Sequence, residues 1–234
     1  MDSRDEALSM LDWWRTAGVD VLVQDAPRDW LRRSVPAPAP VQDGVAPVAA
    51  RSDRMPATIA EVHARLATDP EFGEGRRVAP FGAPHGGLTI FVDMPEQADL
   101  DAGALLSGQL GQLFDRMLAA IGRDRASAYV APLSPTRPIG GRVAPSAIGQ
   151  LAPFALHHAV LAAPRALLLA GEAASRAFLG IGHVEARGRV HEINHGQAKL
   201  TAIATIHPRD LLRNAGRKAD AWRDLRLLIE VLNT

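Results

Sequence analysis

The stretch Leu-Thr-Ile-Phe-Val at residues 88–92 decides the fold class of this chain. Five consecutive apolar or β-branched residues are typical of a strand that is buried on both faces, as in a parallel sheet. Apolar residues then recur every three or four positions across residues 104–121, which predicts an amphipathic helix. A buried strand followed by such a helix is the repeating unit of α/β domains.

The same alternation continues along the rest of the chain. Further strands are predicted at 128–131 and 165–170, and a hairpin at 188–206 with its turn near Asn194-His195-Gly196. Helices are predicted at residues 58–67, 145–161, 172–179 and 217–232. This order predicts a parallel or mostly parallel sheet covered by helices on both faces. The functional loops of such sheets follow the carboxyl ends of the strands, so the loops after Val92 and after Ile206 are candidate sites.

The sequence predicts a main domain over residues 53–234 with an N-terminal appendage. Residues 1–33 are interpreted as a helical extension that is rich in Asp and Glu. Residues 34–52 contain Pro-Ala-Pro-Ala-Pro and are interpreted as an extended linker. We expect the extension to pack on the main domain.

Composition excludes several classes of function. The chain has 234 residues, 47% of them hydrophobic, and 26 basic residues balance 26 acidic ones, so no basic coat surrounds the whole protein. The absence of cysteine excludes disulfides, thiol catalysis and a cysteine-held iron–sulphur cluster. No apolar run reaches the roughly eighteen residues of a membrane span, and the acidic N-terminus lacks the basic start of a signal peptide. A cytoplasmic protein without a membrane partner is expected.

The residues His191-Glu192-Ile193-Asn194-His195 match the zinc-protease pattern H-E-x-x-H. That chemistry needs a helix, where both histidines share one face. The surrounding alternation favours a strand, in which the two histidines would lie about 13 Å apart. We therefore expect no metal site here and no cofactor. His157 and His158 are interpreted as an ordinary surface and core pair.

Three other stretches together resemble the uracil-DNA glycosylase superfamily. They are the glycine-rich loop and helix at 103–122, the segment 129–142, and Ile206-His-Pro-x-x-Leu-Leu-Arg213. The order and spacing are most similar to the bacterial branch that normally carries a four-iron cluster, over about residues 75–232. The resemblance implies a three-layer α/β/α sandwich with a short, mostly parallel central sheet. It also implies DNA repair by base excision from a flipped nucleotide.

The resemblance implies two catalytic residues. His207 would donate a hydrogen bond to the uracil carbonyl as negative charge builds on the leaving base. Asp93, where the family has a glutamate, would orient water or stabilise the positive sugar. We expect the His207 ring at the mouth of a cavity that admits the extruded nucleotide.

The residues implied for the base pocket depart from the family pattern. The glycines of the first motif are replaced by Val92 and Glu96, the stacking aromatic by a leucine, and the base-reading asparagine by a proline. Two cluster cysteines correspond to Thr136 and about Leu151, so no cluster is expected. The implied pocket consists of Val92, Met94, Pro95, Leu106 and Pro132.

Four arginines are candidates for DNA contact. Arg137 and Arg142 lie on a loop that would face DNA, while Arg209 and Arg213 belong either to a phosphate-binding stripe or to a mixed-charge helix surface. The acidic residues at 93, 96, 99 and 101 form either a solvated loop or a DNA-repelling face. Two hypotheses remain open. One is a glycosylase with weak or altered activity, and the other is a non-catalytic module for binding DNA or assembling with other repair proteins.

Overall fold

The computed structural model describes residues 55–234. The predicted N-terminal extension at 1–33 and the linker at 34–52 lie outside the described residues, as does the expected packing of that extension. Within the described part of the chain, no helix is long and apolar enough to cross a membrane.

The described residues form a sheet in the strand order β1-β3-β2-β4-β6-β5. Strands β3, β2, β4 and β6 run parallel to one another, while β1 and β5 are antiparallel edge strands. Val92 at the end of β2 lies opposite both Pro132 of β3 and Ala170 of β4. The mostly parallel sheet is thereby confirmed. Its strands are β1 (Phe81–Gly82), β2 (Leu88–Val92), β3 (Ala128–Pro132), β4 (Ala166–Ala170), β5 (Val190–His195) and β6 (Ala198–Thr205).

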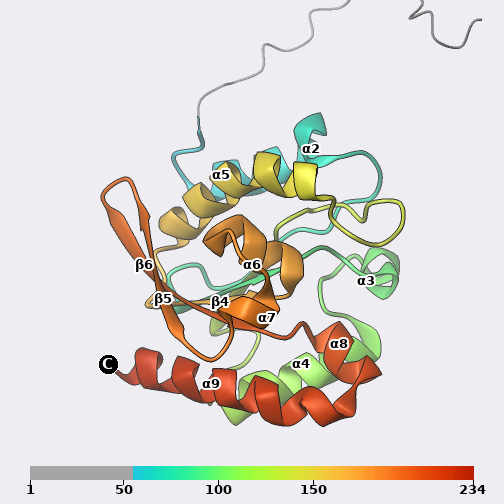
Figure 1. Cartoon of the computed structure of the whole chain (residues 1–234). Helices are drawn as coiled ribbons and strands as arrows, with labels where there is room; N and C mark the ends of the chain where they lie inside the picture. The colour runs from blue at the N-terminus through green and yellow to red at the C-terminus, as the bar shows by residue number, and fades with distance from the viewer. Residues whose placement is uncertain (1–54) are drawn as a thin grey trace, which may run out of the picture. The chain divides into compact units, whose positions relative to one another are not determined.

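Helices cover both faces of the sheet, which confirms the three-layer sandwich (Figure 1). One face carries α2 (Ile59–Thr68), α5 (Pro145–Ala162) and α6 (Glu172–Leu179). The other face carries α4 (Gly108–Ala120) and α9 (Lys218–Asn233). Shorter helices occupy the connections, namely η1 (Pro70–Phe72), α3 (Gln97–Ala102), α7 (His183–Ala186), α8 (Pro208–Arg213) and η2 (Ala215–Arg217).

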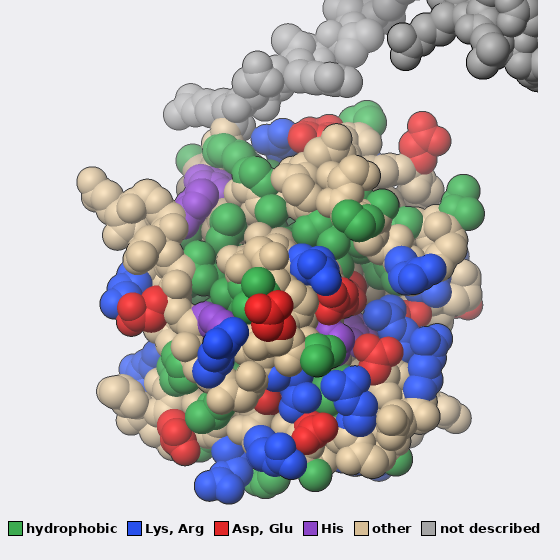
Figure 2. Space-filling model, viewed as in Figure 1, with side chains coloured by type: hydrophobic (Ala, Val, Ile, Leu, Met, Phe, Trp, Pro, Cys, Tyr) green, Lys and Arg blue, Asp and Glu red, His purple; other side chains and the backbone are tan. Residues whose placement is uncertain are grey.

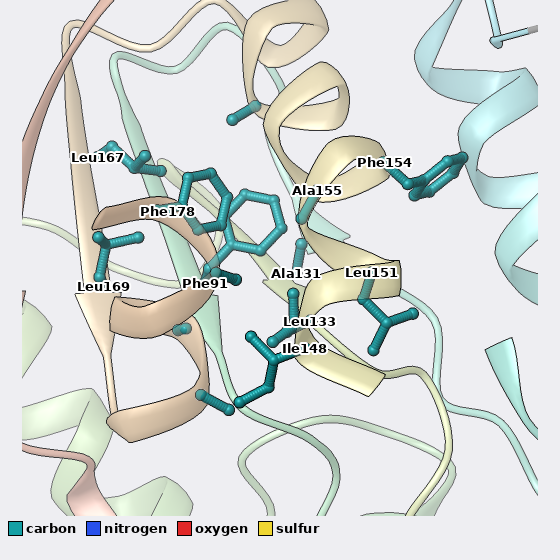
Figure 3. Close-up of a cluster of buried hydrophobic side chains, with 14 of the residues drawn as sticks. Phe91, Ala131, Leu133, Ile148, Leu151, Phe154, Ala155, Leu167, Leu169 and Phe178 are labelled. Carbon is teal, nitrogen blue, oxygen red and sulfur yellow. The ribbon is translucent and has the colours of Figure 1, made fainter. Parts of the chain in front are cut away.

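The core between the sheet and α5 is built around aromatic rings (Figure 3). Phe91 of β2 packs on Phe178 of α6 with ring centroids 4.7 Å apart. His158 of α5 is buried in this layer, and its Nε2 lies 2.7 Å from the Tyr129 hydroxyl. His157 is partly exposed, so the pair has one core and one surface member as predicted.

The strand order creates a crevice at one end of the sheet. β2 lies between β3 and β4, the next two strands along the chain. The connection from β2 to β3 runs through α4 on one face, and the connection from β3 to β4 runs through α5 on the other. Loops that diverge in this way leave room at the carboxyl ends of the strands, where ligands of open α/β sheets bind.

The helix predicted at 104–121 begins later than expected, and α3 precedes it. Gly103 ends α3 in the left-handed conformation, with φ +69°. The Asp99 carboxylate, 2% exposed, accepts hydrogen bonds from the backbone N–H groups of Glu96 at 2.9 Å and Ser107 at 2.6 Å. The interpretation of Asp99 as part of a solvated loop is therefore wrong, because this side chain organises the turn between two helices.

The hairpin is confirmed as β5 and β6, which pair from Val190–Ile203 to His195–Ala198. The H-E-x-x-H stretch lies on β5, as its alternation predicted. Its side chains have local partners: His191 Nε2 lies 2.7 Å from the Ala186 carbonyl oxygen, and Glu192 forms an ion pair with Lys199 at 2.7 Å.

Candidate functional site

A cavity of about 500 Å³ opens at the carboxyl ends of the strands, in the crevice that the strand order creates. Asp93 and Met94, which follow β2, form one wall. A second wall is formed by Glu172 and Ala173 at the start of α6, and a third by Arg209 of α8. The loop between β3 and α5 completes the lining. The loops after Val92 and after Ile206 thus both contribute to one site, in agreement with the sequence-based expectation.

Asp93 is fixed against the N-terminus of α6. Its Oδ1 accepts a hydrogen bond from the Ala174 backbone N–H at 2.9 Å, and its Oδ2 lies 3.4 Å from Arg209 Nη2. Gly171 makes this approach possible, because a Cβ there would lie 2.5 Å from the carboxylate. Burial raises the pKa of Asp93 above its usual value, although the helix N–H groups, Arg209 and His183 act in the opposite direction. Asp93 therefore caps α6 and remains on the cavity wall.

His207 is held in one tautomer by the start of α8. Its Nδ1 accepts a hydrogen bond from the Arg209 backbone N–H at 3.1 Å, so the ring proton lies on Nε2. Burial, together with Arg209 and His183, lowers the pKa of His207 to about 3, and the ring is neutral at pH 7. Nε2 is buried and has no hydrogen-bond partner among residues 55–234.

The expectation that His207 stands at the cavity mouth is wrong for the free protein. The residue is 1% exposed and does not line the cavity. The backbone N–H of Arg209 holds the ring at the start of α8, and the Arg209 side chain forms ion pairs with Asp93 and Glu96. The ring becomes reachable only after neighbouring side chains move.

Two of the four predicted DNA-binding arginines are paired with carboxylates inside the protein. Glu96 contacts Arg209 Nη1 at 2.5 Å with Oε1 and Arg137 Nη1 at 2.8 Å with Oε2. Arg137 also donates to the Pro95 carbonyl oxygen at 3.1 Å. We call Arg209, Glu96 and Arg137 the ionic bracket, since it joins the loops that follow β6, β2 and β3. Basic and acidic side chains are interspersed on the face shown in Figure 2.

The remaining two arginines have different surroundings. Arg142 lines the cavity, is exposed and has no carboxylate within ion-pair distance in the described part of the chain. Arg213 is exposed at the end of α8. Both side chains are free to meet a phosphate, so their contact with DNA stays a prediction.

Of the five residues predicted for the base pocket, Met94 lines the cavity. Val92 and Leu106 instead belong to the hydrophobic cluster under α4 and α9. Pro95 and Pro132 are buried and do not line the cavity either. These four residues are buried away from the cavity, where apolar side chains are stabilised by removal from water, and their contact with a base stays a prediction.

Two residues of the site were missed from the sequence. Glu172, the first residue of α6, lines the cavity and accepts hydrogen bonds through Oε2 from the His183 backbone N–H at 3.1 Å and from its Nδ1 at 2.7 Å. His183 Nε2 is buried and has no partner among the described residues. A signal was present, since Gly171-Glu172 follows an apolar strand whose carboxyl end points to the same crevice.

The residues at the expected cluster positions do not fit an iron–sulphur cluster. Thr136 and Leu151 line a second cavity of about 410 Å³, together with Phe72 and Gly73. Iron–sulphur clusters are held mainly by cysteine thiolates, and neither a hydroxyl nor an isobutyl group replaces them. Thr136 Oγ1 instead donates a hydrogen bond to the Phe72 carbonyl oxygen at 3.0 Å. This hydrogen bond joins the loop after β3 to η1.

Comparison with known families is consistent with this geometry. The family model of the Uracil DNA glycosylase superfamily matches residues 79–226, well over half of the chain. The matched range begins just before β1, extends into α9 and contains every residue that lines the first cavity. The chain therefore belongs to the uracil DNA glycosylase superfamily.

Proposed function

We propose that this protein is a DNA glycosylase with weak or altered activity, which hydrolyses the N-glycosidic bond of a flipped uracil or other damaged base. The observation that carries the proposal is the neutral His207 ring, whose Nε2–H is buried without a partner among residues 55–234. An unpaired buried donor costs stability and needs an explanation. A base oxygen that gains negative charge as the bond to the sugar breaks would supply the missing acceptor.

Asp93 supplies the second group that the reaction needs. Cleavage leaves the electron pair of the C1′–N bond on the base and positive charge on the sugar, and water then adds at C1′. A carboxylate on the cavity wall stabilises that charge or orients the water. The contact of Asp93 with the N-terminus of α6 fixes its position for either role.

The activity is expected to be weak because His207 is buried beside the cavity and does not line it. His207 is 1% exposed, so a base reaches it only after the surrounding side chains rearrange. The apparent affinity falls by the fraction of molecules that are open, tenfold for each 1.4 kcal/mol of opening free energy. Moreover, no asparagine or aromatic side chain stands at the positions of Pro132 and Leu106 to read and stack the base.

Burial of His207 and Leu106 also favours a second candidate, a non-catalytic module that binds DNA or assembles with other repair proteins. Superfamily membership supports DNA as the partner in both cases. Descent from the iron–sulphur branch is part of the proposal, and it is supported by Thr136 and Leu151 lining one cavity. The cytoplasmic location stays a prediction.

The test is a glycosylase assay with the full chain on uracil, hypoxanthine and xanthine in single- and double-stranded oligonucleotides. The measured product is the alkali-labile abasic site. We expect slow excision that His207→Ala reduces by about a hundredfold or more, while His195→Ala at the far end of β5 leaves it unchanged. Wild-type protein that forms no more product than His207→Ala contradicts the proposal. DNA binding without product would then support the non-catalytic module.

A further inference from the structure

The carboxyl end of β6 is tied to α9 by a buried carboxylate. Asp224 of α9 and Thr205, the last residue of β6, are both fully buried. Asp224 Oδ2 accepts hydrogen bonds from the Thr205 hydroxyl at 2.9 Å and from Nε of Arg187, the residue after α7, at 2.7 Å. A single oxygen atom of Asp224 thus joins β6, α7 and α9.

Thr205 is also the point at which the segments that carry the two candidate catalytic residues meet. Its carbonyl oxygen accepts a hydrogen bond from the Gly171 N–H at 3.2 Å. Gly171 precedes α6, whose Ala174 N–H holds Asp93 at 2.9 Å. In the other direction, one residue separates Thr205 from His207. The position of Thr205 therefore bears on Asp93 through α6 and on His207 along the chain.

Stability alone gives little reason for the carboxylate at this position. The second oxygen of Asp224, Oδ1, is buried and has no hydrogen-bond partner among residues 55–234. A buried ion pair repays the cost of removing two charges from water only when further hydrogen bonds satisfy both groups, and apolar side chains of similar volume often stabilise a fold as well or better. The carboxylate does supply direction, because both donors must point to the same oxygen atom.

We propose that Asp224 is a positioning residue, which acts through Thr205 to set the direction in which the chain leaves β6 and thereby the placement of His207 relative to Asp93. Thr205 is the last residue of β6 that pairs with β4, so its side-chain hydrogen bond holds the chain where the strand pairing ends. The effect on the reaction rate rests on the proposed function, whereas the effect on the His207 ring does not. A misplacement of reacting groups by about 1 Å can slow a reaction roughly a hundredfold.

Thr205→Val tests the inference because it keeps the shape of the side chain and removes the hydroxyl donor. Thr136→Val is the matched control, since it makes the same change at another buried threonine, whose hydroxyl donates to the Phe72 carbonyl oxygen. Long-range ¹H–¹⁵N spectra of the histidine-labelled full chain follow the His207 ring, and the absence of its signals from His207→Ala identifies them.

The expected result follows from the tautomer of His207. In the wild type the proton lies on Nε2, so the signals of the two ring nitrogens are well separated. We expect Thr205→Val to bring these signals closer together, because the displaced ring populates both tautomers. Thr136→Val should leave them at their wild-type positions, and urea unfolding measures the stability that each variant loses.

Conservative variants separate positioning from stability. Thr205→Ser keeps the hydroxyl and should restore the wild-type His207 signals. Asp224→Asn removes the charge opposite Arg187 but still offers one oxygen to both donors, so it should unfold more easily than the wild type and yet keep these signals. Asp224→Leu has no acceptor and should change them as Thr205→Val does. If Asp224→Leu does not fold, Thr205→Val and Asp224→Asn decide the question.

The oligonucleotide assay measures the consequence for the rate. Thr205 and Asp224 do not line the cavity, so Thr205→Val should lower kcat roughly 10- to 100-fold with little change in KM. Thr205→Ser should recover the wild-type kcat, and Thr136→Val should keep it.

The inference is overturned if Thr205→Val leaves the His207 signals unchanged, or if the change simply follows the lost stability in every variant, Thr136→Val included. Altered His207 signals in Thr205→Val, together with a wild-type protein that excises no base, support the inference and contradict the glycosylase proposal. Excision that depends on His207 but is unaffected by Thr205→Val contradicts the inference and supports the glycosylase proposal.

Discussion

The substitution Gly171→Ala adds a single carbon atom, the Cβ, at the contact between α6 and Asp93. Gly171 has φ +123° and lies directly before α6. A methyl group there would lie 2.5 Å from Asp93 Oδ2 and 2.6 Å from Oδ1. The carboxylate must therefore move away, and it loses the hydrogen bond that it accepts from the Ala174 N–H.

The magnitude follows from two contributions. An alanine held at this backbone conformation costs about 1–3 kcal/mol. The lost hydrogen bond to a buried carboxylate costs about 1–3 kcal/mol more. We expect the free energy of unfolding to fall by about 2–6 kcal/mol. For a domain of this size, that lowers the melting temperature by roughly 4–24 °C.

Gly180→Ala is the matched control, because Gly180 ends the same helix at φ +74° and has no atom within 4 Å of the added methyl group. It carries the backbone strain alone and should cost about 1 kcal/mol. Urea unfolding followed by circular dichroism measures both variants. Gly171→Ala should destabilise an Asp93→Ala protein much less than it destabilises the wild type, because the carboxylate that the methyl group displaces is then absent. Equal destabilisation by the two glycine variants would refute the assigned contact.

Three other predictions concern stability and its dependence on pH. Burial lowers the pKa values of His158 and His207 to about 3, so the unfolded chain binds protons below pH 6.5 that the folded protein excludes. Each ring should account for about 2 kcal/mol of stability lost between pH 7 and pH 5, and a phenylalanine variant that unfolds with the wild-type pH slope would contradict this. Burial raises the pKa of Asp93, so wild-type protein should gain stability relative to Asp93→Asn as the pH falls from 7 toward 4, as measured by urea titration at several pH values. Thr136→Val removes the hydrogen bond to the Phe72 carbonyl oxygen and should lower the free energy of unfolding by about 1 kcal/mol, whereas Thr136→Ser should unfold at nearly the wild-type midpoint.

The fold could be predicted from the sequence wherever one local pattern dominates. The strand at 88–92 and the hairpin with its turn at His195-Gly196 were predicted almost to the residue, because apolar runs and turn glycines are local properties. Helix α3 was missed because it depends on the Asp99 carboxylate bonding to backbone groups on both sides of the turn. That interaction is not visible in a hydrophobicity pattern.

The site was predicted only in part, for a related reason. The resemblance identified Asp93 and His207, which the fold brings to the same crevice from β2 and β6. It did not predict that Glu96 pairs with Arg137 and Arg209, since those three residues are brought together by loops from three strands. The choice of partner among many charges is a property of the three-dimensional arrangement. The same holds for the hydrogen bond between Glu172 and His183.

The ionic bracket changes what the arginines contribute to contact with a polyanion. An arginine that leaves Glu96 for a phosphate exchanges one anionic partner for another, so the gain in Coulomb energy is small. The vacated carboxylate then attracts cations from solution, which offsets the counterions released from the nucleic acid. A plot of log affinity against log salt concentration should consequently be shallow for this protein. The affinity of the protein for a nucleic-acid strand would therefore change little between dilute buffer and the ionic strength of a cell.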